Sequence, residues 1–590
     1  MPPKALAGKA PKIRRGHTGC KTCRKRGKKC DEAKPYCRAC IRLKLHCRYA
    51  VDYTFRHHDQ HNTASAYVLP QVKIKKAAPT LSQSPDHKAL VKVSPIETCF
   101  PTFLDCGSNL EATYWGHFQR HVRHLLPAGS ALFAEGAMQS PSLRFAALCI
   151  SASNLSMLNS QAQHRAITKD LRRSVTSPLV NKLHHAEAQA YHGRALVASL
   201  SKKEQSGSPA ELAALVLLAY YHHASTDHSK FRLAVWDTVR FVLLNKEALL
   251  QSAEGMGALQ IWYRLCISHR LSKPPALMLE GEGPSAFGPN RFPDTFDNLF
   301  LCCILSLSSD DLIYDILIKS IEIRSRLVLF RCVAGSHQKS EPSDNIGSVA
   351  YRMLNKLLGR DLTESEQAEA EQGFVRGSNL TRLLEIQRQR LQVWKSRLNS
   401  GQVPRDLDAG ARFPSHRDAM NVLYFLLCEM MFAEGELGMA AGTTQSETES
   451  LPINLATLAG SICQVAASLD FRSSNTQDVY TFSLSEVLLQ LVLIWRSETV
   501  FHLILDVVWP QMESKSRGYE HSHYPTHLAK RIITEIARYW DRGQAVTFVQ
   551  PAVTEDIPKT KLLDIDHPID VVVAGYGRAG GYFIKRIHLP

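Results

Sequence analysis

The chain has 590 residues, of which 44% are hydrophobic and 21% charged, a composition that excludes a wholly disordered or collagen-like protein. No apolar run approaches the ~18 to 20 residues that cross a bilayer, and the first residues lack the apolar stretch of a secretory signal. The net charge is +16, but residues 1–50 hold 16 Lys and Arg against only Asp31 and Glu32. This basic end favours a polyanionic partner, nucleic acid before an anionic membrane surface.

Six of the 15 cysteines form a spaced cluster, C-x2-C-x6-C-x6-C-x2-C-x6-C. They are Cys20, Cys23, Cys30, Cys37, Cys40 and Cys47. The pattern of the first three recurs 17 residues later, which predicts two similar half-units. Without a secretory signal three disulfides are disfavoured, and the Lys/Arg-rich sequence between the cysteines cannot form an apolar core. Paired thiolates at C-x2-C spacing favour Zn²⁺.

Counting ligands predicts how many zinc ions the cluster binds. One tetrahedral zinc would leave two thiolates unused, whereas two zincs need eight ligand positions from six sulfurs, so two sulfurs must bridge. The repeat symmetry makes Cys20 and Cys37 the bridges. One zinc is then held by Cys20, Cys23, Cys30 and Cys37, and the other by Cys20, Cys37, Cys40 and Cys47. Sulfur fills every position, so both ions are structural and none is open for catalysis.

The two half-units differ in the residues between their cysteines. Residues 24–29 carry five cations in six positions, whereas in residues 41–46 cations alternate with aliphatic residues. We therefore expect the first helix to face the major groove of double-stranded DNA, while the second packs as well as contacting phosphate. The predicted DNA-contacting residues are Arg24, Lys25, Arg26, Lys28, Lys29, Arg42 and Lys44.

The segment Cys20–Cys47, with its basic first half and its Asp31…Lys34-Pro35 loop, resembles the fungal Zn(2)-Cys(6) binuclear cluster of transcription factors. The resemblance implies a short helix in each half, the same zinc bridging, and readout of a short GC-rich triplet from the first helix. Many relatives have a lysine at the position of Gly27, so Arg26 or Lys28 would make the base contact here. It also implies a nuclear regulator of RNA polymerase II genes that works with transcriptional co-regulators and is not an enzyme.

The flanking composition divides the N-terminal part of the chain. We assign residues 1–15 to a basic disordered arm, 16–50 to the Zn₂Cys₆ DNA-binding domain, and 51–95 to a linker rich in His, Pro and Ser. No heptad repeat follows Cys47. Monomeric binding and a homodimer formed through the rest of the chain therefore both remain open.

Residues 96–550 show helical periodicity and predict a large all-α regulatory domain. Expected helices span residues 112–126, 211–221, 231–244, 256–267, 298–305, 349–358, 378–398, 418–434, 455–469, 485–495, 498–508 and 526–540. Through Tyr114–Pro127 and Pro141–Leu148, this body resembles the fungal-specific transcription factor regulatory (middle homology) domain. The pairs His184-His185 and His222-His223 are expected on helix surfaces or as hydrogen-bonded core residues, and Met430-Met431 in the core.

Residues 551–590 contain a motif that suggests an alternative function. The apolar run Ile569–Ala574 precedes Gly575–Gly580, which reads G-x-G-x-x-G, the phosphate-binding turn of dinucleotide folds. Only ten residues follow Gly580, with no second strand and no acidic residue about 20 positions on. We expect a terminal strand or loop packed on the body. The alternative is a nucleotide-dependent enzyme or sensor that uses this turn.

Overall fold

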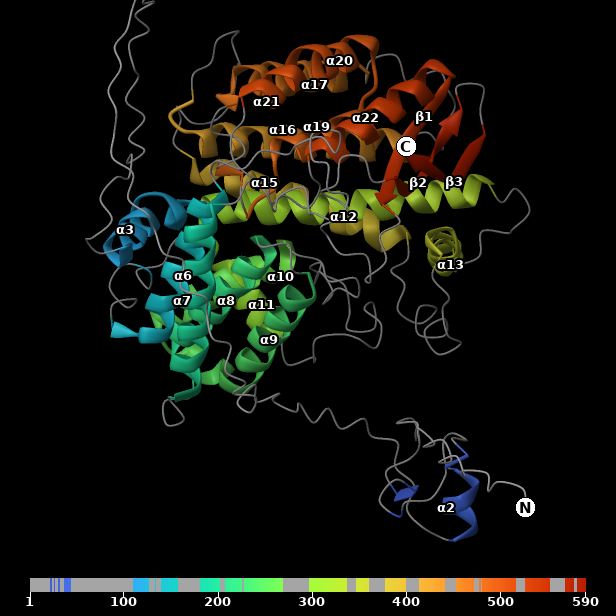
Figure 1. Ribbon diagram of the computed structural model, residues 1–590. Helices are drawn as coiled ribbons and strands as arrows, with labels where there is room; N and C mark the ends of the chain where they lie inside the picture. The colour runs from blue at the N-terminus through green and yellow to red at the C-terminus, as the bar shows by residue number, and fades with distance from the viewer. Residues whose placement is uncertain are drawn as a thin grey trace, which may run out of the picture. The chain divides into compact units, whose positions relative to one another are not determined.

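The computed structural model divides the chain into two compact units, Met1–Thr102 and Phe103–Pro590, which are described separately below (Figure 1). No described helix is long and apolar enough to span a membrane. The described residues are 22–23, 26, 30–31, 37–43, 110–126, 133, 139–157, 181–201, 207–224, 228–268, 297–336, 346–359, 377–398, 413–440, 452–471, 477–478, 480–515, 526–551, 568–577 and 581–589.

The second unit begins with a group of helices packed around Ala-rich segments. They are α3 (Leu110–His117), the π-helical η1 (Phe118–Val122), α4 (Arg123–Leu125), α6 (Pro141–Met157), α7 (Lys182–Ser201), α8 (Pro209–Ala224), α9 (His228–Leu250), α10 (Ala253–Ser268) and α11 (Asp297–Leu305). Helix α6 packs against α7 and α8, and α8 packs against α9 and α10. Small side chains such as Ala146, Ala147 and Ala214 are fully buried, and they let the helix axes approach closely.

The 28-residue helix α12 (Ser309–Ser336) connects this group to the rest of the unit (Figure 1). It packs against α10 on one side, and against α13, α15, α16 and all three strands elsewhere. Ser308 precedes the helix as its N-terminal cap, because its Oγ accepts a hydrogen bond from the Asp311 backbone N–H at 3.2 Å. Helix α12 was not among the expected helices. Its apolar residues lie on nearly all sides, so no single apolar stripe marks it.

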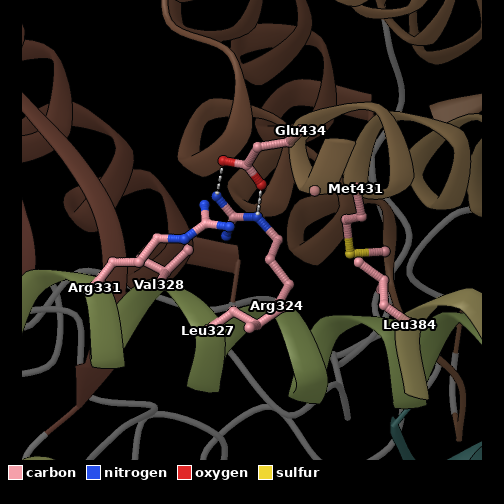
Figure 2. A pocket seen from close by; sticks show the side chains of 8 residues that line it. Arg324, Leu327, Val328, Arg331, Leu384, Met431 and Glu434 are labelled. Atoms are coloured by element: carbon pink, nitrogen blue, oxygen red, sulfur yellow. Dashed lines mark hydrogen bonds and ion pairs between the residues drawn. The ribbon is translucent and has the colours of Figure 1, made fainter. Parts of the chain in front are cut away.

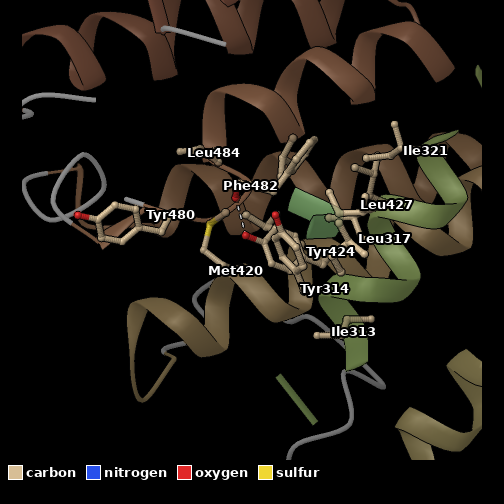
Figure 3. Close-up of a cluster of buried hydrophobic side chains, with 14 of the residues drawn as sticks. Ile313, Tyr314, Leu317, Ile321, Met420, Tyr424, Leu427, Tyr480, Phe482 and Leu484 are labelled. Carbon is tan, nitrogen blue, oxygen red and sulfur yellow. Dashed lines mark hydrogen bonds between the residues drawn. The ribbon is translucent and has the colours of Figure 1, made fainter. Parts of the chain in front are cut away.

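Helices α13 to α22 complete the helical part of the unit. They are α13 (Ile346–Leu358), α15 (Gly377–Arg397), α16 (His416–Ala440), α17 (Pro452–Ser468), α19 (Leu484–Ile494), α20 (Glu498–His502), η5 (Leu503–Val508), α21 (Trp509–Lys515) and α22 (Thr526–Asp541). Helix α16 packs between α12 and α17, and α19 packs on α22. Figure 3 shows Tyr314 of α12 beside Tyr424 of α16, whose hydroxyl donates to the backbone carbonyl of Phe482. The expectation of a largely helical body is confirmed.

The end of the unit is a three-stranded antiparallel sheet in the order β1-β2-β3, which corrects the all-α expectation. The strands are β1 (Gln544–Pro551), β2 (Ile569–Gly577) and β3 (Tyr582–Leu589). Residues 546–549 and 571–573 are dominated by β-branched and aromatic side chains that suit a buried strand. Strand β1 falls inside the range predicted as all-helical, so the helical region ends with α22 at Asp541.

The structure explains Gly575 of the G-x-G-x-x-G motif without a nucleotide, while residues 578–580 of the motif lie outside the described residues. Gly575 and Gly577 lie within β2, and a Cβ atom at Gly575 would be 1.9 Å from the backbone oxygen of Ala545 on β1. The Gly577 N–H donates to the Gly581 carbonyl at 2.9 Å, and the chain then enters β3. The described residues after the motif form strand β3 and not the helix that a phosphate-binding turn requires, so the structure gives the nucleotide-site alternative no support.

Candidate zinc centre and nucleic-acid interface

The second half-unit is built on the short helix α2 (Arg38–Arg42). Cys37 is the N-terminal cap of α2, and its Sγ accepts a hydrogen bond from the Cys40 backbone N–H at 3.4 Å. Its carbonyl also accepts hydrogen bonds from Cys40 N and Ile41 N, at 3.0 and 3.1 Å. The C-x2-C spacing thus places Cys37 and Cys40 on one helical turn with both side chains buried.

The first half-unit contributes Cys23 to the same centre. Thr22 and Cys23 are helical, and Arg26 N donates to Thr22 O at 3.1 Å. The Sγ of Cys23 lies 3.6 Å from that of Cys37 and 3.9 Å from that of Cys40. Two sulfurs on one tetrahedral zinc, each about 2.3 Å from it, lie about 3.8 Å apart, whereas a disulfide joins sulfurs at about 2.05 Å. The spacing of these thiols therefore fits a metal centre.

Cys37 belongs to two groups of potential ligands. One group is Cys23, Cys37 and Cys40, and the other is Cys30, Asp31 and Cys37, with all ligand atoms of a group within 4.8 Å of one another. Cys37 is common to both groups, as a bridging sulfur would be, but the first group joins Cys23 to Cys40, which the prediction assigns to different zincs. The structure thus brings together four of the six predicted ligands, and Cys20 and Cys47 lie outside the described residues.

Asp31 has a role that the cysteine spacing did not reveal. Its Oδ2 accepts a hydrogen bond from the Arg38 backbone N–H at 3.0 Å. Asp31 follows Cys30 of the first half and Arg38 begins α2 of the second, so this contact joins the two halves beside the thiols. The Asp31 carboxylate is therefore engaged as a capping group, and the zinc ligands are better supplied by sulfur.

Two of the predicted DNA-contacting residues are described, and both are exposed. Arg26 lies in the turn after Cys23, and Arg42 lies in the last turn of α2. Arg24, Lys25, Lys28, Lys29 and Lys44 lie outside the described residues.

The expected packing role of the second helix is not seen in the described residues. Ile41 and Leu43 are 60% and 44% exposed. The reason is that the thiol centre takes the place of an apolar core, so that Cys40 is the buried residue of α2.

Comparison with known proteins identifies the N-terminal module. Residues 18–53 match the family described as Fungal Zn(2)-Cys(6) binuclear cluster domain. This segment is a Zn₂Cys₆ domain. Its cofactor is two zinc ions, and the buried thiol donors at metal-ligand spacing fit them. Bound zinc would keep the thiols as thiolates and supply the folding energy that so short a segment lacks.

Two curated relatives match over short stretches. Sterol uptake control protein 2 of Candida albicans is 29% identical over 110 residues, 16% of this chain and 15% of the relative. Transcriptional regulatory protein pro1 of Neurospora crassa is 39% identical over 74 residues, 12% of this chain and 10% of the relative. This chain thus spans less than a sixth of either relative. No solved structure matches it.

A hollow in the second unit lies between α12, α15 and α16 (Figure 2). Arg324 lines it and is paired with Glu434 through two hydrogen bonds, Nε to Oε2 at 2.5 Å and Nη2 to Oε1 at 2.9 Å. Arg331 and Met431 also line it. Its volume of about 10 Å³ is close to that of a single water. This hollow is far smaller than an effector pocket of some 300 to 1,000 Å³.

The histidine and methionine pairs have the structural roles expected of them. The Tyr114 hydroxyl lies 2.9 Å from His184 Nδ1, and His222 Nε2 lies 3.0 Å from His192 Nε2. Met430 and Met431 are buried in the core.

Proposed function

We propose that this protein is a nuclear, sequence-specific DNA-binding regulator of transcription that acts on RNA polymerase II genes. The observation that carries the proposal is the Zn₂Cys₆ domain at residues 18–53, placed in a 50-residue segment with 16 Lys and Arg and two acids. The name of one relative, a transcriptional regulatory protein, agrees with this class.

In the proposed mechanism the zinc cluster holds two short helices in a fixed relation. Cys20, Cys23, Cys30, Cys37, Cys40 and Cys47 would hold the two zinc ions, which would supply the structural link between the two halves. The cations from Arg24 to Lys29 lie in the major groove, where Arg26 or Lys28 reads base edges of a GC-rich triplet. Arg42 and Lys44 contact phosphates, which fixes the position on DNA without specifying sequence.

The helical second unit would be the regulatory part. We assign it the role of the fungal middle homology domain, which would contact transcriptional co-regulators when the protein is bound to DNA. The proposal is supported by its position after a Zn₂Cys₆ domain and by its largely helical fold.

The proposal is tested by selecting bound sequences from random duplex DNA with the full-length protein. Wild-type protein with zinc should enrich a GC-rich triplet. Chelator, or the substitution Cys37→Ala, should abolish enrichment because a bridging sulfur serves both ions. Cys302→Ala is the matched control, since Cys302 is an exposed cysteine of α11 outside the cluster, and it should bind as wild type does. Strong binding without enrichment that is lost with salt would overturn sequence-specific readout.

A further inference from the structure

Helix α9 presents an unusual face to solvent. Its buried side carries Phe231, Val235, Val239, Val242 and Leu249, which pack into the core. On the opposite side Leu233, Trp236 and Leu244 are 58%, 52% and 77% exposed. They recur at i, i+3 and i+11, a spacing that places them on one stripe about 17 Å long. Large apolar side chains aligned on an outer helix face mark an interaction surface.

The charged residues on the same stripe are arranged with internal symmetry. Lys230, Asp237, Arg240 and Glu247 are all exposed. Positions 237 and 240 are equally distant from a centre between residues 238 and 239, and so are positions 230 and 247. The apolar positions 233 and 244 share the same centre. The order of signs reads plus, minus, plus, minus, so each charge has its opposite at the symmetry-related position.

This symmetry specifies what the face can bind. When two copies of α9 meet antiparallel about that centre, Asp237 lies opposite the second copy's residue 240, and Lys230 opposite its residue 247. Leu233 meets the second copy's residue 244. A parallel pair in register would instead place each charge against its own kind. Interfaces with two-fold symmetry require this reciprocal matching, in which residue i contacts j and j contacts i.

We propose that the α9 face, defined by Lys230, Leu233, Trp236, Asp237, Arg240, Leu244 and Glu247, is the interface of an antiparallel homodimer. The sequence after Cys47 has no heptad repeat that would form a coiled-coil dimer, so this face supplies a dimerisation element in the second unit. The proposal does not depend on DNA recognition by the Zn₂Cys₆ domain.

The first test is the mass of the full-length, zinc-loaded protein in solution, by analytical ultracentrifugation over a range of concentrations. Wild-type protein should reach twice the chain mass of 66.0 kDa. Leu244→Glu should weaken association about tenfold or more, because it places a carboxylate in the apolar stripe. Leu305→Glu is the matched control, since Leu305 is 71% exposed on α11 outside the stripe, and it should associate as wild type does. Unchanged circular dichroism verifies the fold of each variant.

Charge exchange tests the register. Asp237→Arg and Arg240→Asp should each weaken the dimer, and the double variant should restore it because the pairs are exchanged. Mixing the two single variants should also give a dimer, since one copy then carries two cations and the other two anions. A monomeric wild-type protein, an unaffected Leu244→Glu variant, or a double variant no better than the singles would overturn the proposal.

Discussion

His117 lies in α3 with its imidazole largely enclosed, and its Nε2 is 2.9 Å from Asn154 Oδ1. Burial lowers its pKa to about 4; the contact with Asn154 opposes this shift, and nearby His121 and Arg120 add to it. The folded protein therefore keeps this ring neutral at a pH where the unfolded chain, with an ordinary pKa of about 6.5, binds a proton.

Acidification should destabilise the second unit through this residue. As the pH falls below about 6.5 the unfolded state gains a proton that the folded state does not bind, so the free energy of unfolding falls until about pH 4. We expect His117 to account for about 2 kcal/mol between pH 7 and pH 5. Urea unfolding at the two pH values should show a smaller pH effect in His117→Gln. The exposed His124→Gln should keep the wild-type difference.

At the residue scale, the cysteine spacing was enough to predict the thiol centre, because ligand number and spacing are properties of the sequence alone. Of the six predicted ligands, the structure places Cys23, Cys30, Cys37 and Cys40 in two groups that share Cys37. The contact between Asp31 and the Arg38 N–H could not be predicted, since it depends on how the two halves are oriented.

At the element scale, many of the helices were predictable, including α19, which is buried on all sides, but several helices and the pairing of the strands were not. Helix α22 was predicted to within a residue, whereas α6, α7, α12 and α21 were absent from the prediction. Strand β2 lies where a terminal strand or loop was expected, but the sheet around it was missed because β1 follows α22 after only two residues and its register is set by β2. Pairing between strands is a long-range property that a single segment does not carry.

Gly575 allows a direct test of the sheet. Gly575→Ala should lower the free energy of unfolding by about 2 kcal/mol or more, because the added Cβ would collide with the Ala545 carbonyl of β1. The thermal unfolding midpoint should fall markedly as a result. Gly460→Ala is the control, since nothing lies within 4 Å of its Cβ position in α17, and it should be neutral or stabilising. Equal midpoints for the two variants would contradict the β1–β2 pairing.

At the scale of the whole second unit, buried ion pairs on α12 connect segments distant in sequence. Asp315 accepts a hydrogen bond from Tyr263 of α10 at 2.7 Å, and it pairs with Lys319 at 3.0 Å and with Arg390 of α15 at 2.7 Å. Burial alone would raise the pKa of Asp315, but the two cations and these hydrogen bonds hold it below its ordinary value.

Removing the Asp315 carboxylate should strongly lower the free energy of unfolding. Asp315→Ala leaves the buried ammonium of Lys319 without this partner, and we expect a loss of about 3 to 5 kcal/mol in the free energy of unfolding. Arg538→Ala breaks an exposed pair with Glu535 and should cost at most about 1 kcal/mol. Chemical denaturation of both variants measures the difference. A loss at Asp315 no larger than at Arg538 would contradict a structural role for the buried pairs.

The hydrogen bonds of Arg324 determine how a premature stop codon near the C-terminus would affect the stability of the protein. This buried guanidinium on α12 donates to the Thr547 carbonyl of β1 at 3.2 Å and to the Leu493 carbonyl at the end of α19 at 2.7 Å. Arg496 likewise donates to the Val546 carbonyl at 3.1 Å. A stop codon before position 544 would leave Arg324 without its acceptor on Thr547 and Arg496 without its acceptor on Val546, in a core that also lacks the sheet. Its product would then be a substrate for cellular proteases, and the mutant allele would behave as a loss of the whole protein.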